Sequence, residues 1–186
     1  KYSDDLSHRI PQSIIQQFDV LLQAECRKKH IPCKAVICGS YRRGKADSGD
    51  IDILLTREDW EDKNQAAACL QIALKHLSDK AILVDHLTST TTCKTKYMGF
   101  LRIPGYPYAC RVDIRAVVFV QYVTALAYFT GSGEENVRLR RIASKKKMKL
   151  NEYGLTCIDT GKLHPLQSEE HLYEALDEPY VPPSLR

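Results

Sequence analysis

Apolar side chains recur at helical spacing near the start of the chain. They predict a helix that begins around Arg9-Ile10-Pro11 and runs to about Lys28. Pro11 would lie in the first turn, where its missing N–H is not needed, and His30-Ile31-Pro32 would end the helix, because a residue before proline avoids helical angles. The positions that define the apolar face are Ile10, Ile14, Ile15, Phe18, Leu21 and Leu22.

Five apolar runs of strand length and a second helical pattern follow before residue 119. Asp59 is the expected N-cap of a helix over Trp60 to Leu77, and we interpret Trp60 as a packing residue. Pro104-Gly105-Tyr106-Pro107 predicts a short turn between the last two strands. The predicted strands are Ala35 to Cys38, Ile51 to Thr56, Ala81 to Leu87, Lys94 to Ile103 and Tyr108 to Val118.

From Phe119 onward the pattern becomes mainly helical. Val120 to Phe129 predicts an apolar helix, the glycines of Thr130-Gly131-Ser132-Gly133 would break it, and Glu134 to Lys146 predicts a strongly basic helix. A last helix is expected near Glu169 to Leu176. These elements predict an α+β fold with two lobes, in which a mixed or antiparallel sheet with two helices is followed by a small, mostly helical lobe.

Composition narrows the class of protein but does not identify a function. The chain has 186 residues, a formal net charge of +4 and 44% hydrophobic residues, so a polyanion site would have to arise from local clusters of charge. Its seven cysteines are scattered, which favours reduced thiols in an intracellular protein. The six histidines show no ligand spacing and are interpreted as incidental, and no membrane segment is visible. Residue 1 is Lys, so we expect a fragment of a longer protein.

Two aspartates on one strand are the first candidate chemistry. Side chains two residues apart point to the same side of a strand, so Asp50 and Asp52 should lie together while Ile51 and Ile53 enter the core. Two like charges at this separation favour a cation between them, and oxygen ligands suit Mg²⁺. The alternative is a solvated strand face beside a turn.

A glycine-serine turn and a third acid extend this site. Gly39-Ser40 opens a predicted short helix whose free N–H groups could hold an anion. Asp113 interrupts an apolar strand, and a buried carboxylate needs a partner. A metal shared with Asp50 and Asp52 would supply it, and two such ions suit in-line displacement at phosphorus. Asp113 could also accept a proton from the attacking hydroxyl.

Four segments in this order resemble the family X DNA polymerases. They are Gly39-Ser40-Tyr41-Arg42-Arg43-Gly44, Gly49-Asp50-Ile51-Asp52, Arg111-Val112-Asp113-Ile114-Arg115 and Tyr128-Phe129-Thr130-Gly131-Ser132. The resemblance spans nearly the whole chain. It implies a nucleotidyltransferase-type palm over residues 1–119 and a nucleotide-selecting thumb over 120–186, without the N-terminal lyase and helix-hairpin-helix parts of full-length relatives.

The resemblance also implies roles for individual residues. Asp50, Asp52 and Asp113 would bind two Mg²⁺ ions, with Mn²⁺ as a substitute, and carry the catalysis. Arg115 would pair with Asp52 in an inactive state and with Glu152 or Tyr153 in the active one. The nucleotide-binding residues would be Arg9, Gly39, Ser40, Arg43, Ser48, Gly49, Tyr128, Phe129, Gly131 and Asn136. An unusual backbone site, a cis peptide, is expected at Gly131-Ser132. The DNA-binding residues would be Lys96, Arg111 and Arg140.

Each of these roles has a simpler alternative. Arg111 and Arg115 could only balance charge around Asp113, Arg140 could be one more solvated charge on a basic helix, and Tyr128 and Phe129 could be core residues. The chain also departs from the family at Gly133 and Val137, where an acidic and a basic residue are common.

The predicted function is template-directed addition of dNMP from dNTP to a primer 3′-hydroxyl in short gaps of DNA. The short Pro104 to Pro107 turn leaves no room for the long loop of template-independent relatives. The resemblance implies gapped primer–template DNA and dNTP as partners, a nucleus location, and base excision repair or end joining as the setting, with repair proteins contacting other regions. The alternatives are another nucleotidyltransferase, acting on RNA ends or a small molecule, and a non-catalytic DNA-end binding module.

Overall fold

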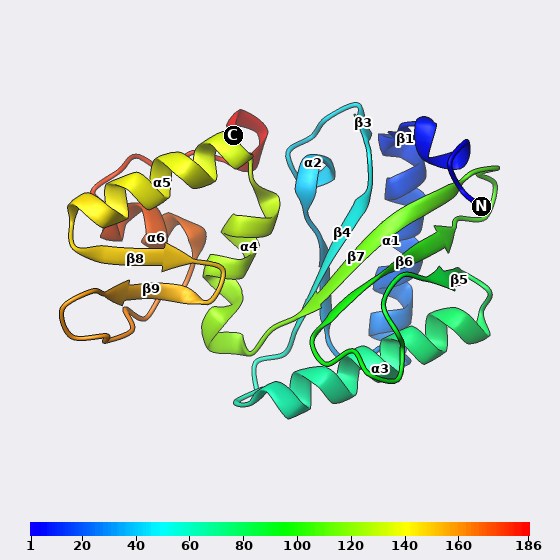
Figure 1. The fold of residues 1–186 in the computed structure, drawn as a ribbon, viewed down its shortest axis with the longest axis horizontal. Coiled ribbons are helices and arrows are strands. Elements are labelled where there is room, and N and C mark those ends of the chain that lie inside the picture. The colour runs from blue at the N-terminus through cyan, green and yellow to red at the C-terminus, as the bar shows by residue number, and fades with distance from the viewer.

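The computed structural model describes all residues, 1–186, as two lobes joined at η2 and α4 (Figure 1). Residues before 119 form a five-stranded sheet with two long helices. Residues after 121 form three helices and a small two-stranded sheet. The helices are α1 Gln12–Arg27, α2 Gly39–Arg42, α3 Lys63–Asp79, α4 Tyr122–Thr130, α5 Gly133–Lys145 and α6 Glu169–Ala175, with short 3-10 helices η1 Asp5–Ser7, η2 Phe119–Gln121 and η3 Pro183–Leu185. None of these helices combines the length and apolar character needed to cross a membrane.

The main sheet is mixed, one of the two arrangements predicted. Its strand order is β2-β4-β7-β6-β5, and only the central pair β4 and β7 is parallel. The small sheets pair β1 with β3 and β8 with β9. The strands are β1 Ile10–Pro11, β2 Lys34–Ile37, β3 Asp47–Ser48, β4 Ile51–Thr56, β5 Leu83–His86, β6 Lys96–Arg102, β7 Ala109–Ala116, β8 Met148–Asn151 and β9 Gly154–Cys157.

One face of the main sheet packs on α1 and α3. Phe18 and Leu22 from α1 and Leu70 and Leu74 from α3 are buried in one cluster with the inward residues of β4 and β7. Trp60 is also buried in this cluster, as predicted. On the opposite face, Leu54 of β4 is buried against Ala125 and Leu126 of α4. Asp52, two residues earlier on β4, lies on this same face, which carries the candidate site.

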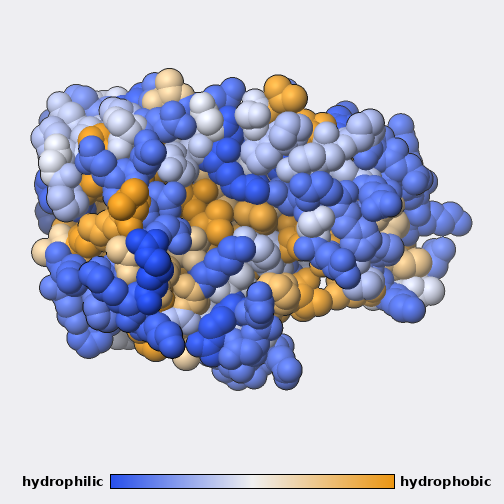
Figure 2. Space-filling model, turned by 180° about the vertical axis from the view of Figure 1, so that it is seen from behind, coloured by the Kyte–Doolittle hydropathy of each residue, from blue (hydrophilic) through white to orange (hydrophobic).

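The second lobe has a core of its own. Leu139 and Ala143 from α5 pack against Leu155 from β9 and Leu172 and Tyr173 from α6. Seen from behind, hydrophobic side chains gather around the middle of the molecule, while hydrophilic ones cover most of its two ends (Figure 2).

Two predicted helix starts are wrong. α1 begins at Gln12, because Pro11 is extended (ψ 144°) and Ile10–Pro11 forms β1 with Asp47–Ser48. α3 begins at Lys63 rather than Trp60, because Asp62 forms a capping box with Gln65. Asp59, the predicted cap, instead pairs with Arg57.

Candidate active site

The three aspartates meet at the middle of the main sheet. Asp52 on β4 lies directly opposite Asp113 on β7 in the parallel register, and Asp50 comes immediately before β4. The intervening residues Ile51 and Ile53 are buried, at 1% and 3% exposure. The alternation of the two strands therefore brings all three carboxylates to the face away from α1 and α3, as predicted.

Too little positive charge surrounds these carboxylates. Burial and the neighbouring Asp50 and Asp113 raise the pKa of Asp52 to about 7, and burial and Asp113 raise the pKa of Asp50. Asp113 has one buried oxygen, Oδ1, without a hydrogen-bond partner. Its other oxygen, Oδ2, is 3.5 Å from Arg111 Nη2, which is long for a charged hydrogen bond.

This donor set fits divalent ions. Hard cations prefer carboxylate oxygens, and a bound cation would relieve both the raised pKa of Asp52 and the unpartnered oxygen of Asp113.

The glycine-serine turn closes over the carboxylates. Gly39 has φ +59°, and a Cβ placed there would lie 2.5 Å from Asp52 Oδ2, so only glycine lets the backbone approach. Ser40 Oγ donates a hydrogen bond to Ser48 Oγ at 2.7 Å. The turn and the β3 segment are thus held together beside Asp52, although α2 is only one turn long.

Two arginines border this turn. Arg9 pairs with Asp47 at 2.9 Å, and its Nη1 lies 3.1 Å from the Cβ position of Gly49. Arg43 Nη1 donates to the carbonyl of Thr130 at 2.6 Å, beside Gly131. The structure therefore gathers every predicted phosphate-binding residue around the same turn.

The end of α4 supplies the other wall. Phe129 borders a small cavity with Asp52, Asp113 and Arg115. The rings of Tyr128 and Phe129 are edge to face, with centroids 5.1 Å apart. The Gly131–Ser132 peptide is cis, as the resemblance suggested.

Neither predicted pairing of Arg115 is formed. Its guanidinium lies over the Phe129 ring, 5.1 Å from the centroid, and it makes no ion pair with Asp52 or Glu152. It also lines a cavity of about 170 Å³ that Phe129, Glu152 and Tyr153 border. The Tyr153 hydroxyl instead accepts a hydrogen bond from Lys96 Nζ at 3.2 Å. Arg115 therefore lies on the Phe129 ring and borders both the cavity with Asp52 and the cavity with Glu152.

Asn136 and Arg140 lie apart from the carboxylates. Together with Tyr128 they line a separate small cavity. Asn136 Nδ2 donates to the Tyr128 carbonyl at 2.9 Å, and the Arg140 guanidinium lies 5.6 Å from the Tyr128 ring centroid. This bond uses one of the two N–H groups of the Asn136 amide, so the second N–H and the Oδ1 atom remain for a base contact.

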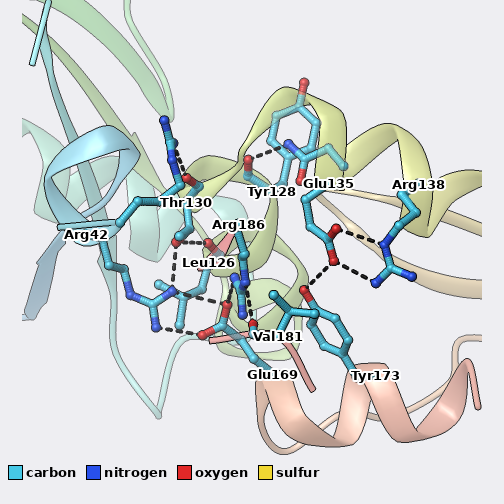
Figure 3. A network of polar contacts seen from close by, with 12 residues as sticks. Arg42, Leu126, Tyr128, Thr130, Glu135, Arg138, Glu169, Tyr173, Val181 and Arg186 are labelled. Carbon is cyan, nitrogen blue, oxygen red and sulfur yellow. Dashed lines mark hydrogen bonds and ion pairs between the residues drawn. The ribbon is translucent and has the colours of Figure 1, made fainter. Parts of the chain in front are cut away.

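A buried ion-pair network that the sequence did not predict joins the two lobes (Figure 3). Arg42 on α2 bonds both oxygens of Glu169 on α6, at 2.6 and 3.1 Å, and the Thr130 hydroxyl at 2.8 Å. Arg186 also bonds Glu169, at 2.7 Å. Burial would raise the pKa of Glu169, but the hydrogen bonds from Arg42 and Arg186 outweigh it and lower that pKa. Arg42 therefore fixes the Gly39-Ser40 turn relative to the second lobe.

Gly133 and Val137, the two positions that depart from the family pattern, border one exposed hollow on α5. Arg141 and Lys145 border the same hollow. Nothing lies within 4 Å of a Cβ placed at Gly133, and Val137 is 47% exposed. The hollow is therefore bordered by basic side chains, and Gly133 and Val137 lie open to solvent.

Comparison with known proteins agrees with this arrangement. The family model of the DNA polymerase beta palm matches residues 9–118, and that of the DNA polymerase beta thumb matches residues 125–186. The chain is 30% identical to DNA polymerase lambda of Rattus norvegicus and 29% identical to DNA polymerase lambda of Arabidopsis thaliana. Both matches cover the whole chain but only 34% and 38% of the relatives. It is also 34% identical to the DNA polymerase/3'-5' exonuclease PolX of Bacillus subtilis, over 80% of the chain and 23% of that protein. The chain thus spans about a third of the length of the polymerase lambda relatives it matches.

Proposed function

The chain belongs to the family X DNA polymerases, and from that premise we propose that it carries the catalytic centre of a template-directed DNA polymerase that fills short gaps during repair. The observation that carries the proposal is the meeting of Asp52 and Asp113 in register beside the Gly39-Ser40 turn. We further propose residues 1–119 as the palm and 120–186 as the thumb. A nuclear location, and base excision repair or end joining as the setting, are proposed on the resemblance alone.

Asp50, Asp52 and Asp113 would hold two divalent ions, Mg²⁺ in the first instance. Such ions supply positive charge at the attacking and leaving oxygens of phosphoryl transfer. Burial, together with the neighbouring Asp50 and Asp113, raises the pKa of Asp52, and this supports the assignment.

The chain's own residues would position the reactants. Ser40, Arg43 and the Gly49 backbone would bind the β- and γ-phosphates of a dNTP, because they surround the turn next to the carboxylates. Arg111 would contact the primer backbone. Asp113 would accept the proton of the primer 3′-hydroxyl, whose oxygen forms a bond to the α-phosphorus while the bond to the departing pyrophosphate breaks.

Phe129 and Tyr128 would set the choice of sugar. Both lie in the last turn of α4, where Phe129 lines the carboxylate cavity and Tyr128 lines the neighbouring cavity with Asn136. The sugar of a nucleotide bound at the turn would lie beside them. Contact with backbone at this wall would exclude a 2′-hydroxyl, which favours dNTP over NTP. The basic face of α5, including Arg140, would bind template phosphates.

Primer extension on several substrates tests the proposal. The chain would be given Mg²⁺ and each dNTP or NTP with a gapped duplex, a nicked duplex or a single strand. We expect templated dNMP incorporation on the gapped duplex. Transfer to RNA or NTP use alone would support the other nucleotidyltransferase, and gap binding without extension would support a non-catalytic module.

A further inference from the structure

A second cluster of ligand-type side chains lies where α1 ends against α3. Glu25 is in the last turns of α1, His30 is in the loop that follows, and His76 is in the last turn of α3. His30 Nδ1 is 2.9 Å and His76 Nε2 is 2.5 Å from the same oxygen, Glu25 Oε2. Three donor atoms from three segments therefore converge on one point, although the sequence shows no metal-binding spacing.

The local backbone holds this arrangement in place. The Glu25 carbonyl accepts hydrogen bonds from the N–H groups of both His30 and Ile31, at 3.1 and 3.3 Å. These bonds turn the chain back after α1 and set the His30 ring over the Glu25 side chain. The His30 and His76 rings then lie with centroids 4.9 Å apart.

One oxygen of the Glu25 carboxylate faces both imidazoles. The Glu25 side chain is 9% exposed, and its Oε2 atom contacts His30 Nδ1 and His76 Nε2. Lys28 Nζ lies 4.0 Å from the other oxygen, Oε1, and Lys80 is also close. The Oε2 side is therefore left to the two imidazoles, which can release their protons and bind a metal through the same nitrogens.

We propose that Glu25, His30 and His76 form a Zn²⁺ site. Two imidazoles and one carboxylate are a ligand set that zinc accepts in proteins. Zinc bonds of about 2.0–2.2 Å place neighbouring ligand atoms roughly 3.3 Å apart, so the donors need to separate by less than about 1 Å from their present positions. His30 is 49% exposed, which gives the ion a path from solvent and the ring freedom to move, and water would supply the fourth ligand.

This site is separate from the catalytic carboxylates. α1 begins beside β1 and β3, near the Gly39-Ser40 turn, and runs to the opposite end of the lobe, where it meets α3 (Figure 1). An ion held there would join the loop after α1 to α3 and stabilise the lobe. It would take no part in nucleotidyl transfer.

Zinc titration of matched variants tests the proposal. His30→Gln keeps a hydrogen-bond donor for Glu25 but removes the imidazole. His171→Ala is the control, because His171 lies against His164 in the other lobe with ring centroids 6.0 Å apart. Metal-free, reduced protein would be titrated with Zn²⁺ in millimolar Mg²⁺ by calorimetry, and with Co²⁺ by visible absorption, while Tm is measured with and without Zn²⁺.

We expect the unmodified chain and His171→Ala to bind one Zn²⁺ per chain, with a tetrahedral Co²⁺ spectrum and a Tm rise of roughly 5–10 °C at a hundredfold excess over Kd. His30→Gln should bind at least about tenfold more weakly and should keep its metal-free Tm and its primer extension. Equal binding by His30→Gln would place the ion elsewhere, among the thiols or the aspartates. No binding by the unmodified chain would make the cluster a hydrogen-bond network only. Either result would overturn the proposal.

Discussion

Replacing Asp52 with asparagine should stabilise the metal-free protein while removing its activity. The pKa of Asp52 is raised from its ordinary value of 3.8 to about 7, so the folded state holds this proton more tightly than the unfolded chain does. The stability of the metal-free protein must therefore fall as the pH rises from about 4 to about 7. At about 1.4 kcal/mol for each tenfold change in proton affinity, the full cost is on the order of 4 kcal/mol.

The assay is urea unfolding of the unmodified chain and Asp52→Asn at pH 5 and pH 8 in EDTA. The difference in the free energy of unfolding, Asp52→Asn minus the unmodified chain, should be roughly 2–3 kcal/mol larger at pH 8 than at pH 5. Adding Mg²⁺ should narrow the gap at pH 8, because a bound ion stabilises only the chain that can hold it. The exposed Asp79 is the control, and Asp79→Asn should change stability by less than about 0.5 kcal/mol at either pH. A gap that does not depend on pH would refute the reasoning.

Two further predictions concern close approach and the ion-pair network. Gly39→Ala should lower the rate of dNMP incorporation at least about tenfold, because its Cβ would meet Asp52 Oδ2 at 2.5 Å. Gly44→Ala, at φ +74° with no atom within 4 Å, should cost only about 1 kcal/mol of stability and leave the rate unchanged in single-turnover assays. Arg186→Ala should lower the free energy of unfolding by about 3 kcal/mol in urea, since the side chain is 1% exposed and pairs with the buried Glu169, whereas Lys75→Ala on an exposed pair should cost less than about 1 kcal/mol. Equal losses in either comparison would contradict the assigned roles.

The strands and long helices could be predicted from periodicity. The alternation of Ile51 and Ile53 with the aspartates fixed both the strand and its buried face, and the structure places β4 at the predicted residues. The helix starts could not be placed as well. Asp59 and Asp62 are both residues that can cap a helix. In the structure Asp59 pairs with Arg57, while Asp62 forms the capping box with Gln65. Local sequence does not decide between those contacts.

The site was predictable where its residues lie close in sequence or repeat a family pattern. The network through Arg42, Glu169 and Arg186 was not, because its members are up to 144 residues apart and each alone is an ordinary charge. The histidines were interpreted as incidental for the same reason, since His30 and His76 meet Glu25 only after α1 packs on α3. The position of Arg115 over Phe129 depends on how the two lobes meet.

The most direct test of the central claim is single-turnover primer extension by Asp113→Asn on a gapped duplex with Mg²⁺ and the templated dNTP. Asp113 places an unpartnered buried oxygen at the carboxylate cluster, so its loss should reduce the rate at least about a thousandfold. Gap binding and the unfolding transition should be retained. Incorporation at the unmodified rate by a folded Asp113→Asn would contradict the account.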